Sequence, residues 1–65
     1  MEKEEFENQW SVNAGNFPLH TIELISGGSI IADFAFWTKD FEGIDFFYNE
    51  NHIAHIPLKS IIKVV

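Results

Sequence analysis

The side chains best suited to acid–base or metal chemistry are three histidines, His20, His52 and His55. His52 and His55 lie three residues apart, and side chains three apart on a regular strand face opposite sides of the sheet. Histidine is also found often at protein surfaces, so these residues alone indicate no chemistry. We therefore expect surface histidines and no metal or acid–base cluster.

Four carboxylates fall around the strands expected in the middle of the chain. They are Asp33, Asp40, Glu42 and Asp45. Two carboxylates can act as general acid and general base when their environments separate their pKa values. No spacing here singles out such a pair, so we expect a solvated acidic face.

The serines do not form a recognisable nucleophilic site. Ser26 and Ser29 flank a double glycine as turn residues, and no G-x-S-x-G elbow is present. Gly27 and Gly28 lack the lysine and further glycines of a phosphate-binding loop. With no cysteine to hold zinc, the sequence predicts a protein that is not an enzyme and has no cofactor or metal.

Aromatic residues are numerous, with seven Phe, two Trp and one Tyr among 65 residues. A domain this short has few interior positions, so some rings are expected outside, where they mark an interface. Trp37, Phe41, Phe47 and Tyr48 could stack nucleobases, as aromatic residues on small barrels do. Because basic neighbours are lacking, a protein contact or a core position is the preferred interpretation.

The formal charge is −6, from ten acidic and four basic residues. Such a chain repels phosphate backbones, so direct binding to nucleic acid is disfavoured. One domain of this length buries only about 60% of its unfolded surface. Without a disulfide, we expect association with copies of itself or with a partner to stabilise it.

The chain contains no run of 18 or more apolar residues, so we expect no membrane span. The first ten residues, MEKEEFENQW, are acidic and lack the apolar segment of a secretory signal. The absence of cysteine fits a reducing compartment. These features predict a cytoplasmic protein.

A hairpin around Gly27-Gly28 is the expected centre of the fold, because a tight turn needs a positive φ that glycine reaches without strain. Its strands cover residues 19–26 and 29–38, with Ile22 and Leu24 on one face of the first. The core face predicted for the second strand consists of Ile30, Ala32, Phe34 and Phe36. Its other face is half polar, which suits a long bent strand that serves two sheet surfaces.

Three more strands are expected over residues 44–48, 52–56 and 61–65. Pro57 ends the second of these because it has no N–H, and residues 57–60 form a 3₁₀ turn. The inward side chains of the first are predicted to be Ile44, Phe46 and Tyr48. In the last strand, Ile62 and Val64 are expected to face away from Ile61.

Two interpretations remain for residues 1–13. As a helix, the segment has Glu2, Glu4 and Glu5 in its first turn, where negative charge suits the helix dipole, and Phe6 and Trp10 on one face. As a strand, it alternates from Phe6 to Asn13. The helix is slightly preferred, and both interpretations dock Phe6 and Trp10 on the barrel. Residues 13–18 are expected to form a loop.

The pattern as a whole is that of an all-β, five-stranded SH3-like barrel with a possible short N-terminal helix. Residues 17–65 resemble the Sm-like barrel of the bacterial Hfq type in three places: residues 17–24 (FPLHTIEL), Gly28 in the first turn, and residues 58–61 (LKSI) followed by Val64-Val65. We therefore expect a single domain over residues 1–65, with an N-terminal segment (1–15) and a barrel (19–65).

That resemblance implies a ring of subunits joined edge to edge through the fourth and fifth strands, and RNA binding. Of the family's terminal Lys-His pair only Lys59 carries over. Ile30 or Ile31 stands where a lysine is expected, and the basic rim of the helix is replaced by Glu4, Glu5 and Glu7. The resemblance thus favours the fold and self-association more than RNA binding.

The preferred hypothesis is a non-catalytic, homo-oligomeric interaction module whose acidic surface binds a basic partner protein. A narrower version is an acidic inhibitor that imitates nucleic acid and binds a nucleic-acid enzyme. The composition of the chain is similar to that of small phage-type inhibitors of this kind. The expected partner-binding residues are Trp37, Phe41, Phe47, Asp33, Asp40, Glu42 and Asp45. The alternative is an Sm-like binder of RNA or a nucleotide through Lys59 and Tyr48.

Overall fold

The computed structural model describes residues 1–12 and 19–65, and the loop expected over residues 13–18 lies outside them. The N-terminal segment forms a helix, α1 (Lys3–Val12), with Glu4 and Glu5 in its first turn. The preferred helical interpretation is confirmed, and the strand alternative is wrong. Phe6 and Trp10 stack one turn apart with ring centroids 5.8 Å from each other.

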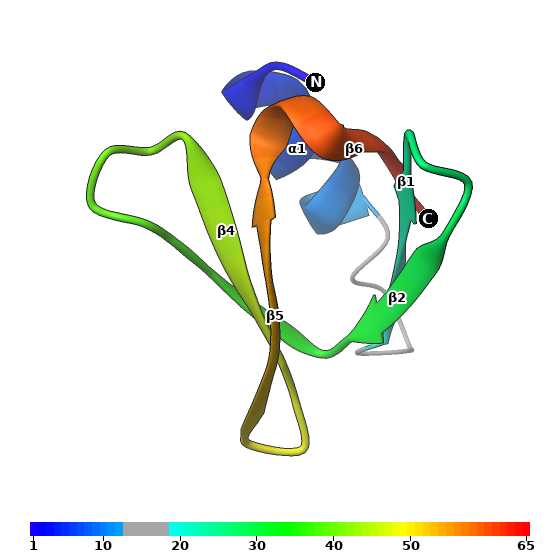
Figure 1. Cartoon of the computed structure of the whole chain (residues 1–65), viewed down its shortest axis with the longest axis vertical. Helices are drawn as coiled ribbons and strands as arrows, with labels where there is room; N and C mark the ends of the chain where they lie inside the picture. The colour runs from blue at the N-terminus through cyan, green and yellow to red at the C-terminus, as the bar shows by residue number, and fades with distance from the viewer. Residues whose placement is uncertain (13–18) are drawn as a thin grey trace.

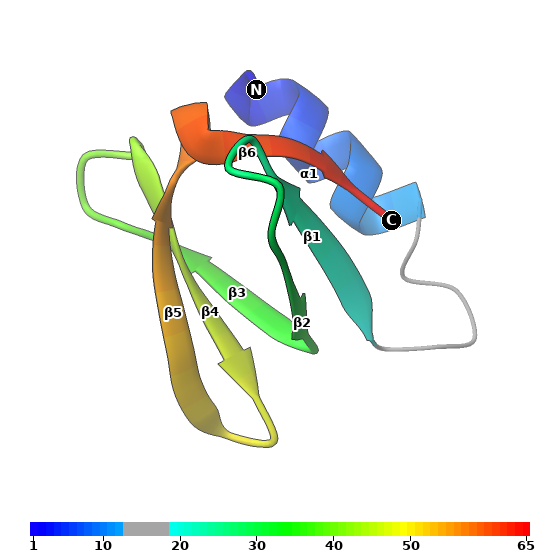
Figure 2. The same ribbon diagram turned by 45° about the vertical axis from the view of Figure 1, so that its right-hand side comes forward.

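The described strands form two antiparallel sheets of three strands each (Figures 1 and 2). The first sheet has the order β2-β1-β6, and the second has the order β3-β4-β5. Their bounds are β1 (His20–Leu24), β2 (Ser29–Ala32), β3 (Phe34–Trp37), β4 (Gly43–Tyr48), β5 (Asn51–Pro57) and β6 (Ile61–Val64). A 3₁₀ turn, η1 (Leu58–Ser60), joins β5 to β6, as the sequence predicted.

The predicted five-stranded barrel is wrong, because six strands lie in two separate sheets that do not close in the described parts of the chain. The single strand expected over residues 29–38 is divided at Asp33. Ala32 still pairs with His20 of β1, whereas the Asp33 N–H donates to the carbonyl of Phe47 on β4 at 3.0 Å. The chain changes its pairing partner at this residue, and each half joins a different sheet.

The change of partner also decides which side chains are buried. Phe46 is fully buried on β4, and Ala35 of β3 pairs with it, so Ala35 shares its inward face. Phe34 and Phe36 therefore lie on the opposite face, where they are 51% and 56% exposed. The predicted core face holds for Ala32 and in part for Ile30, but it is wrong for both phenylalanines.

Among residues 1–12 and 19–65, seven apolar residues from α1 and both sheets make up the buried core. They are Phe6, Ile22, Ala32, Ile44, Phe46, Ile61 and Val64. Burying a large apolar side chain stabilises a fold by about 1.5–3 kcal/mol, so a core of this size is sensitive to any single loss. α1 lies beside β6 in both views, and its Gln9 accepts a hydrogen bond from the Val64 N–H at 2.7 Å (Figures 1 and 2).

Two strand ends differ from the alternation that the sequence suggests. Val64 was expected to face away from Ile61, but a register shift against β1 leaves Ile62 unpaired, so both Ile61 and Val64 face the core. Such a bulge adds one residue and reverses the alternation. Tyr48, expected inward, is 45% exposed because it ends β4 beside the turn.

Candidate functional site

The face of the β3-β4-β5 sheet that points away from the core gathers most of the exposed aromatic and histidine side chains. The cross-strand register builds it in two rows, Phe34–Phe47–His52 and Phe36–Asp45–His55. Side chains directly opposite on neighbouring antiparallel strands lie on the same face and in contact range. We call these six residues the outer face.

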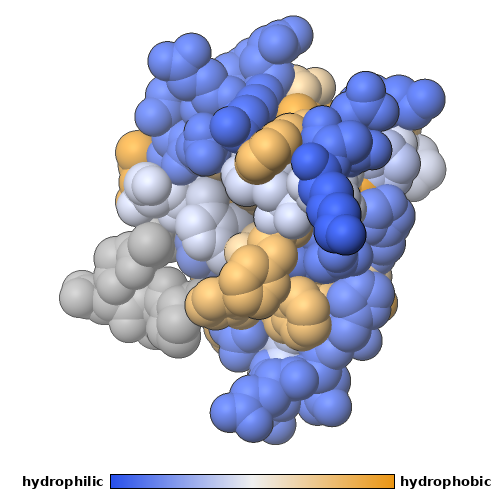
Figure 3. Space-filling model, turned by 90° about the vertical axis from the view of Figure 1, so that its left-hand side faces the viewer, coloured by the Kyte–Doolittle hydropathy of each residue, from blue (hydrophilic) through white to orange (hydrophobic). Residues whose placement is uncertain are grey.

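The aromatic part of the outer face is continuous. The ring of Phe36 lies 4.7 Å from Phe34 and 5.7 Å from Phe47, and Phe47 lies 5.3 Å from the ring of His52, measured between centroids. Figure 3 looks onto the side that carries the β3–β4 connection in Figure 1, and it shows hydrophobic side chains gathered among hydrophilic ones. A contiguous apolar patch on a small protein is typical of a binding surface.

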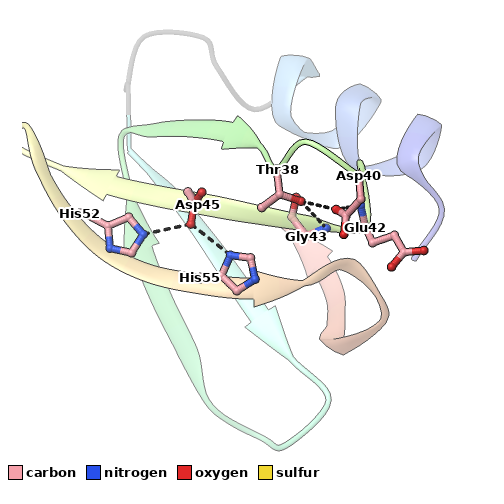
Figure 4. Close-up of polar contacts among 7 residues, drawn as sticks. All are labelled: Thr38, Asp40, Glu42, Gly43, Asp45, His52 and His55. Atoms are coloured by element: carbon pink, nitrogen blue, oxygen red, sulfur yellow. Dashed lines mark hydrogen bonds and ion pairs between the residues drawn. The ribbon is translucent and has the colours of Figure 1, made fainter.

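The polar part of the outer face centres on Asp45, which lies between two imidazoles (Figure 4). One oxygen, Oδ1, accepts hydrogen bonds from His52 Nε2 at 3.0 Å and from His55 Nδ1 at 3.1 Å. The bond from His52, followed by that from His55, lowers the pKa of Asp45. Asp45 is therefore held ionised more firmly than a free aspartate, and the cluster adds a fixed negative charge beside the rings.

A β-bulge in β5 brings the two histidines to the same side. Phe46 pairs with Ala54 while Phe47 pairs with His52, so Ile53 is an extra residue in the ladder. The expectation that His52 and His55 face opposite sides is wrong for this reason. His20 also differs from the expected surface histidine: it is 2% exposed, stacks on Trp10 at 3.7 Å and donates to the Trp10 carbonyl.

The connection between β3 and β4 is a hydrogen-bonded loop next to the outer face. Asp40 Oδ1 accepts bonds from the Thr38 hydroxyl at 2.6 Å and from the Glu42 N–H at 3.0 Å. These two bonds, the first being the larger cause, lower the pKa of Asp40. Between them Phe41 adopts a left-handed backbone, with φ of 59°, and its ring is 53% exposed.

This loop forms one wall of an open groove of about 780 Å³, which we call the Phe41 groove. Its lining includes Asp40, Phe41, Glu42, His55, Leu58 and Lys59. His55 belongs to both surfaces, so the groove continues the outer face. Gly43 lies under this residue, and a Cβ there would come within 2.9 Å of the His55 ring.

The predicted partner-binding residues are distributed over these two surfaces and beyond them. Asp45 and Phe47 lie on the outer face, and Asp40, Phe41 and Glu42 lie on the groove. Asp33 lies at the other end of the sheet, where it accepts a bond from the Asn49 N–H at 3.1 Å. Trp37 points inward instead and packs against Phe6 at 5.5 Å between ring centroids.

Sequence reasoning missed four residues of the outer face. They are Phe34, Phe36, His52 and His55. The one available signal was Asp33, a charged residue inside an otherwise apolar run, which marks the position where the chain changes sheets.

The two residues of the RNA-binding alternative are not brought together. Tyr48 pairs with Asn51 next to the β4–β5 turn, whereas Lys59 follows Pro57, which pairs with Gly43 at the far end of the same hairpin. A single nucleotide pocket built from Tyr48 and Lys59 would have to span the length of β5.

Over residues 1–12 and 19–65, no group of three or more His, Asp or Glu side chains is arranged to hold a metal ion. No helix in the same residues is long and apolar enough to cross a membrane. Comparison with protein-family models, with curated proteins and with solved structures finds no match for the chain.

Proposed function

We propose that the protein is a non-catalytic interaction module that binds a cationic segment of a partner protein across its outer face. The observation that carries this proposal is the ring cluster of exposed Phe34 and Phe36 with half-buried Phe47, beside an ionised Asp45. Aromatic rings attract cations to their faces and offer apolar contact area to the remainder of a side chain.

The charges around the outer face support a basic partner. Asp33 and Glu50 lie near one end of the sheet, and Asp40 and Glu42 lie near the other. The whole chain has a charge of −6. A field of this sign speeds the approach of cationic segments and repels phosphate backbones.

The arrangement also favours the binding of an ordinary protein segment over the alternative in which the protein imitates nucleic acid. An imitator needs closely spaced carboxylates, whereas here apolar rings separate the acids at the two ends. Self-association competes for the same rings, but two copies would bring like charges together, which costs free energy.

A peptide-display selection tests the proposal. We expect it to recover short peptides that combine Arg or Lys with apolar residues, and their affinity should fall as salt screens the acids. Phe36→Ser should weaken the selected peptides about tenfold or more, as loss of a central aromatic contact does. Ile62→Ser is the matched control, since Ile62 is 54% exposed on the other sheet.

Other outcomes of these experiments would contradict the proposal or favour one of its alternatives. Selection of acidic or purely apolar peptides, or equal losses for both variants, would contradict the proposal. Retention of oligo(U) at low salt would favour the RNA-binding alternative instead. Light scattering after size exclusion would show whether the rings are occupied by a second copy, in which case the predicted homo-oligomer is their main use.

A further inference from the structure

The first turn of α1 places a lysine ammonium on the rings beside the Phe41 groove. Lys3 Nζ lies 4.5 Å from the centroid of Phe41 and 5.7 Å from that of Trp37. Both distances fall within the range in which a cation is attracted by an aromatic face. The free protein therefore already holds a positive charge at this position.

The loop holds Phe41 in place for such a contact. A bulky residue at positive φ is strained and persists only where its surroundings fix it. Here the Phe41 N–H donates to the Thr38 carbonyl at 3.0 Å, and Asp40 ties Thr38 to Glu42. The ring is thus positioned before any ligand arrives.

The groove also offers negative charge that Lys3 does not use. In the described part of the chain Lys3 makes no ion pair. The Glu42 carboxylate forms no hydrogen bond with any described side chain or backbone group and points away from Thr38 and Asp40 in Figure 4. A larger cation with several donors would gain contacts that an ammonium on the rings does not make.

We propose that the Phe41 groove binds one arginine side chain of the partner, and that Lys3 occupies the rings until this arginine displaces it. A planar guanidinium can stack on Phe41 and donate two parallel hydrogen bonds to the carboxylate of Glu42, whereas an ammonium is a compact point charge. The inference rests on the proposed function in one respect: it assigns the arginine to the partner segment that binds the outer face. His55 belongs to both the outer face and the groove, so one segment can reach both surfaces.

Titration with N-acetyl-L-argininamide tests the site without the partner. We expect the indole N–H signal of Trp37 and the amide signal of Phe41 to shift together in NMR spectra. N-acetyl-L-citrullinamide, which has the same shape without the charge, should leave both signals in place. Phe41→Gly should abolish the response while keeping the fold, because glycine adopts the positive φ without strain.

Removal of the internal cation tests the displacement. Lys3→Met should tighten binding of N-acetyl-L-argininamide about two- to fivefold, the size expected for an exposed cation–ring contact. Lys63→Met is the matched control, because it removes the same charge from the other sheet, where Lys63 lies 3.5 Å from Glu23. Equal effects of the two variants, or shifts confined to Phe34 and Phe36, would overturn the inference.

The two proposals fail separately. If selected peptides bind the outer face but the arginine probe leaves Trp37 and Phe41 unchanged, the groove assignment is wrong and the proposed function survives. If the probe shifts both signals but selection yields no cationic peptide, the site exists without the proposed partner, and the proposed function is wrong.

Discussion

At the scale of single residues, the strongest local feature is the sharing of one carboxylate oxygen by two imidazoles. Asp45 Oδ1 accepts from His52 and His55, and this arrangement depends on the extra residue Ile53 in β5 and on the missing side chain of Gly43. The position of this charge on the outer face thus depends on five residues of the β4–β5 hairpin, within residues 43–55.

Asp45→Asn should remove an acid-sensitive part of the stability. The folded-state pKa of Asp45 lies below its ordinary value of 3.8, so its contribution is present above that value and is lost as the pH falls through the lower folded-state pKa. Urea unfolding at a series of pH values should show a shallower acid limb for the variant than for the wild type. Glu7→Gln, an exposed carboxylate on α1, is the control, and an unchanged acid limb in Asp45→Asn would contradict the assignment.

At the scale of elements, α1 completes the core from one side. Phe6 is 4% exposed and contacts the rings of Trp10, Trp37 and Phe46 at centroid distances of 5.5–6.1 Å. Neither sheet supplies these contacts by itself, so we expect the helix to be required for the stability of the whole domain.

Phe6→Ala should destabilise the protein by about 3–5 kcal/mol, as truncation of a buried phenylalanine does. That is a large part of the free energy of unfolding of a typical domain, about 5–15 kcal/mol, so the variant should be mostly unfolded at moderate temperature. Circular dichroism during urea unfolding measures the change. Val12→Ala in the same helix, where the side chain is 80% exposed, should stay within about 0.5 kcal/mol of the wild type.

The positions of the helix, strands and turns could be predicted from the sequence more completely than the way the strands pair into sheets. The hairpin at Gly27-Gly28, the turn after Pro57 and the approximate strand positions follow from turn residues and alternation. The change of sheet at Asp33 was marked in the sequence only by the charge of this residue. The alternation of apolar residues continues on both sides of Asp33, so it does not show that the hydrogen-bonding partner of the chain changes there. The bulges at Ile53 and Ile62 are also invisible, since one extra residue in a ladder leaves no mark in the sequence.

The candidate site was predicted only in part for the same reason. The acidic residues of the site and Phe41 could be predicted to be exposed, because they lie in a polar stretch of the sequence. The structure places Asp40, Phe41 and Glu42 together. Phe34 and Phe36 were assigned to the core by a period of two that holds only within one sheet. His52 and His55 lie on the same face because of a bulge that the residue types do not reveal.

At the scale of the whole molecule, a chain with a charge of −6 presents a sheet of exposed rings with acids at both ends. An apolar surface of this kind is unfavourable in water unless something covers it, and the negative charge of the chain is the reason that we propose a cationic partner. Under this proposal, the same field would oppose the binding of nucleic acid and of a second copy of the chain.

The most direct test is to map where a selected cationic peptide contacts the protein, by intermolecular NMR contacts to side chains labelled on both sheets. We predict contacts to Phe34, Phe36 and Phe47, with none to Ile31 and Ile62, which lie on the other sheet and are as exposed as Phe34 and Phe36. Contacts confined to Ile31 and Ile62, with the three phenylalanine rings unchanged, would contradict the account.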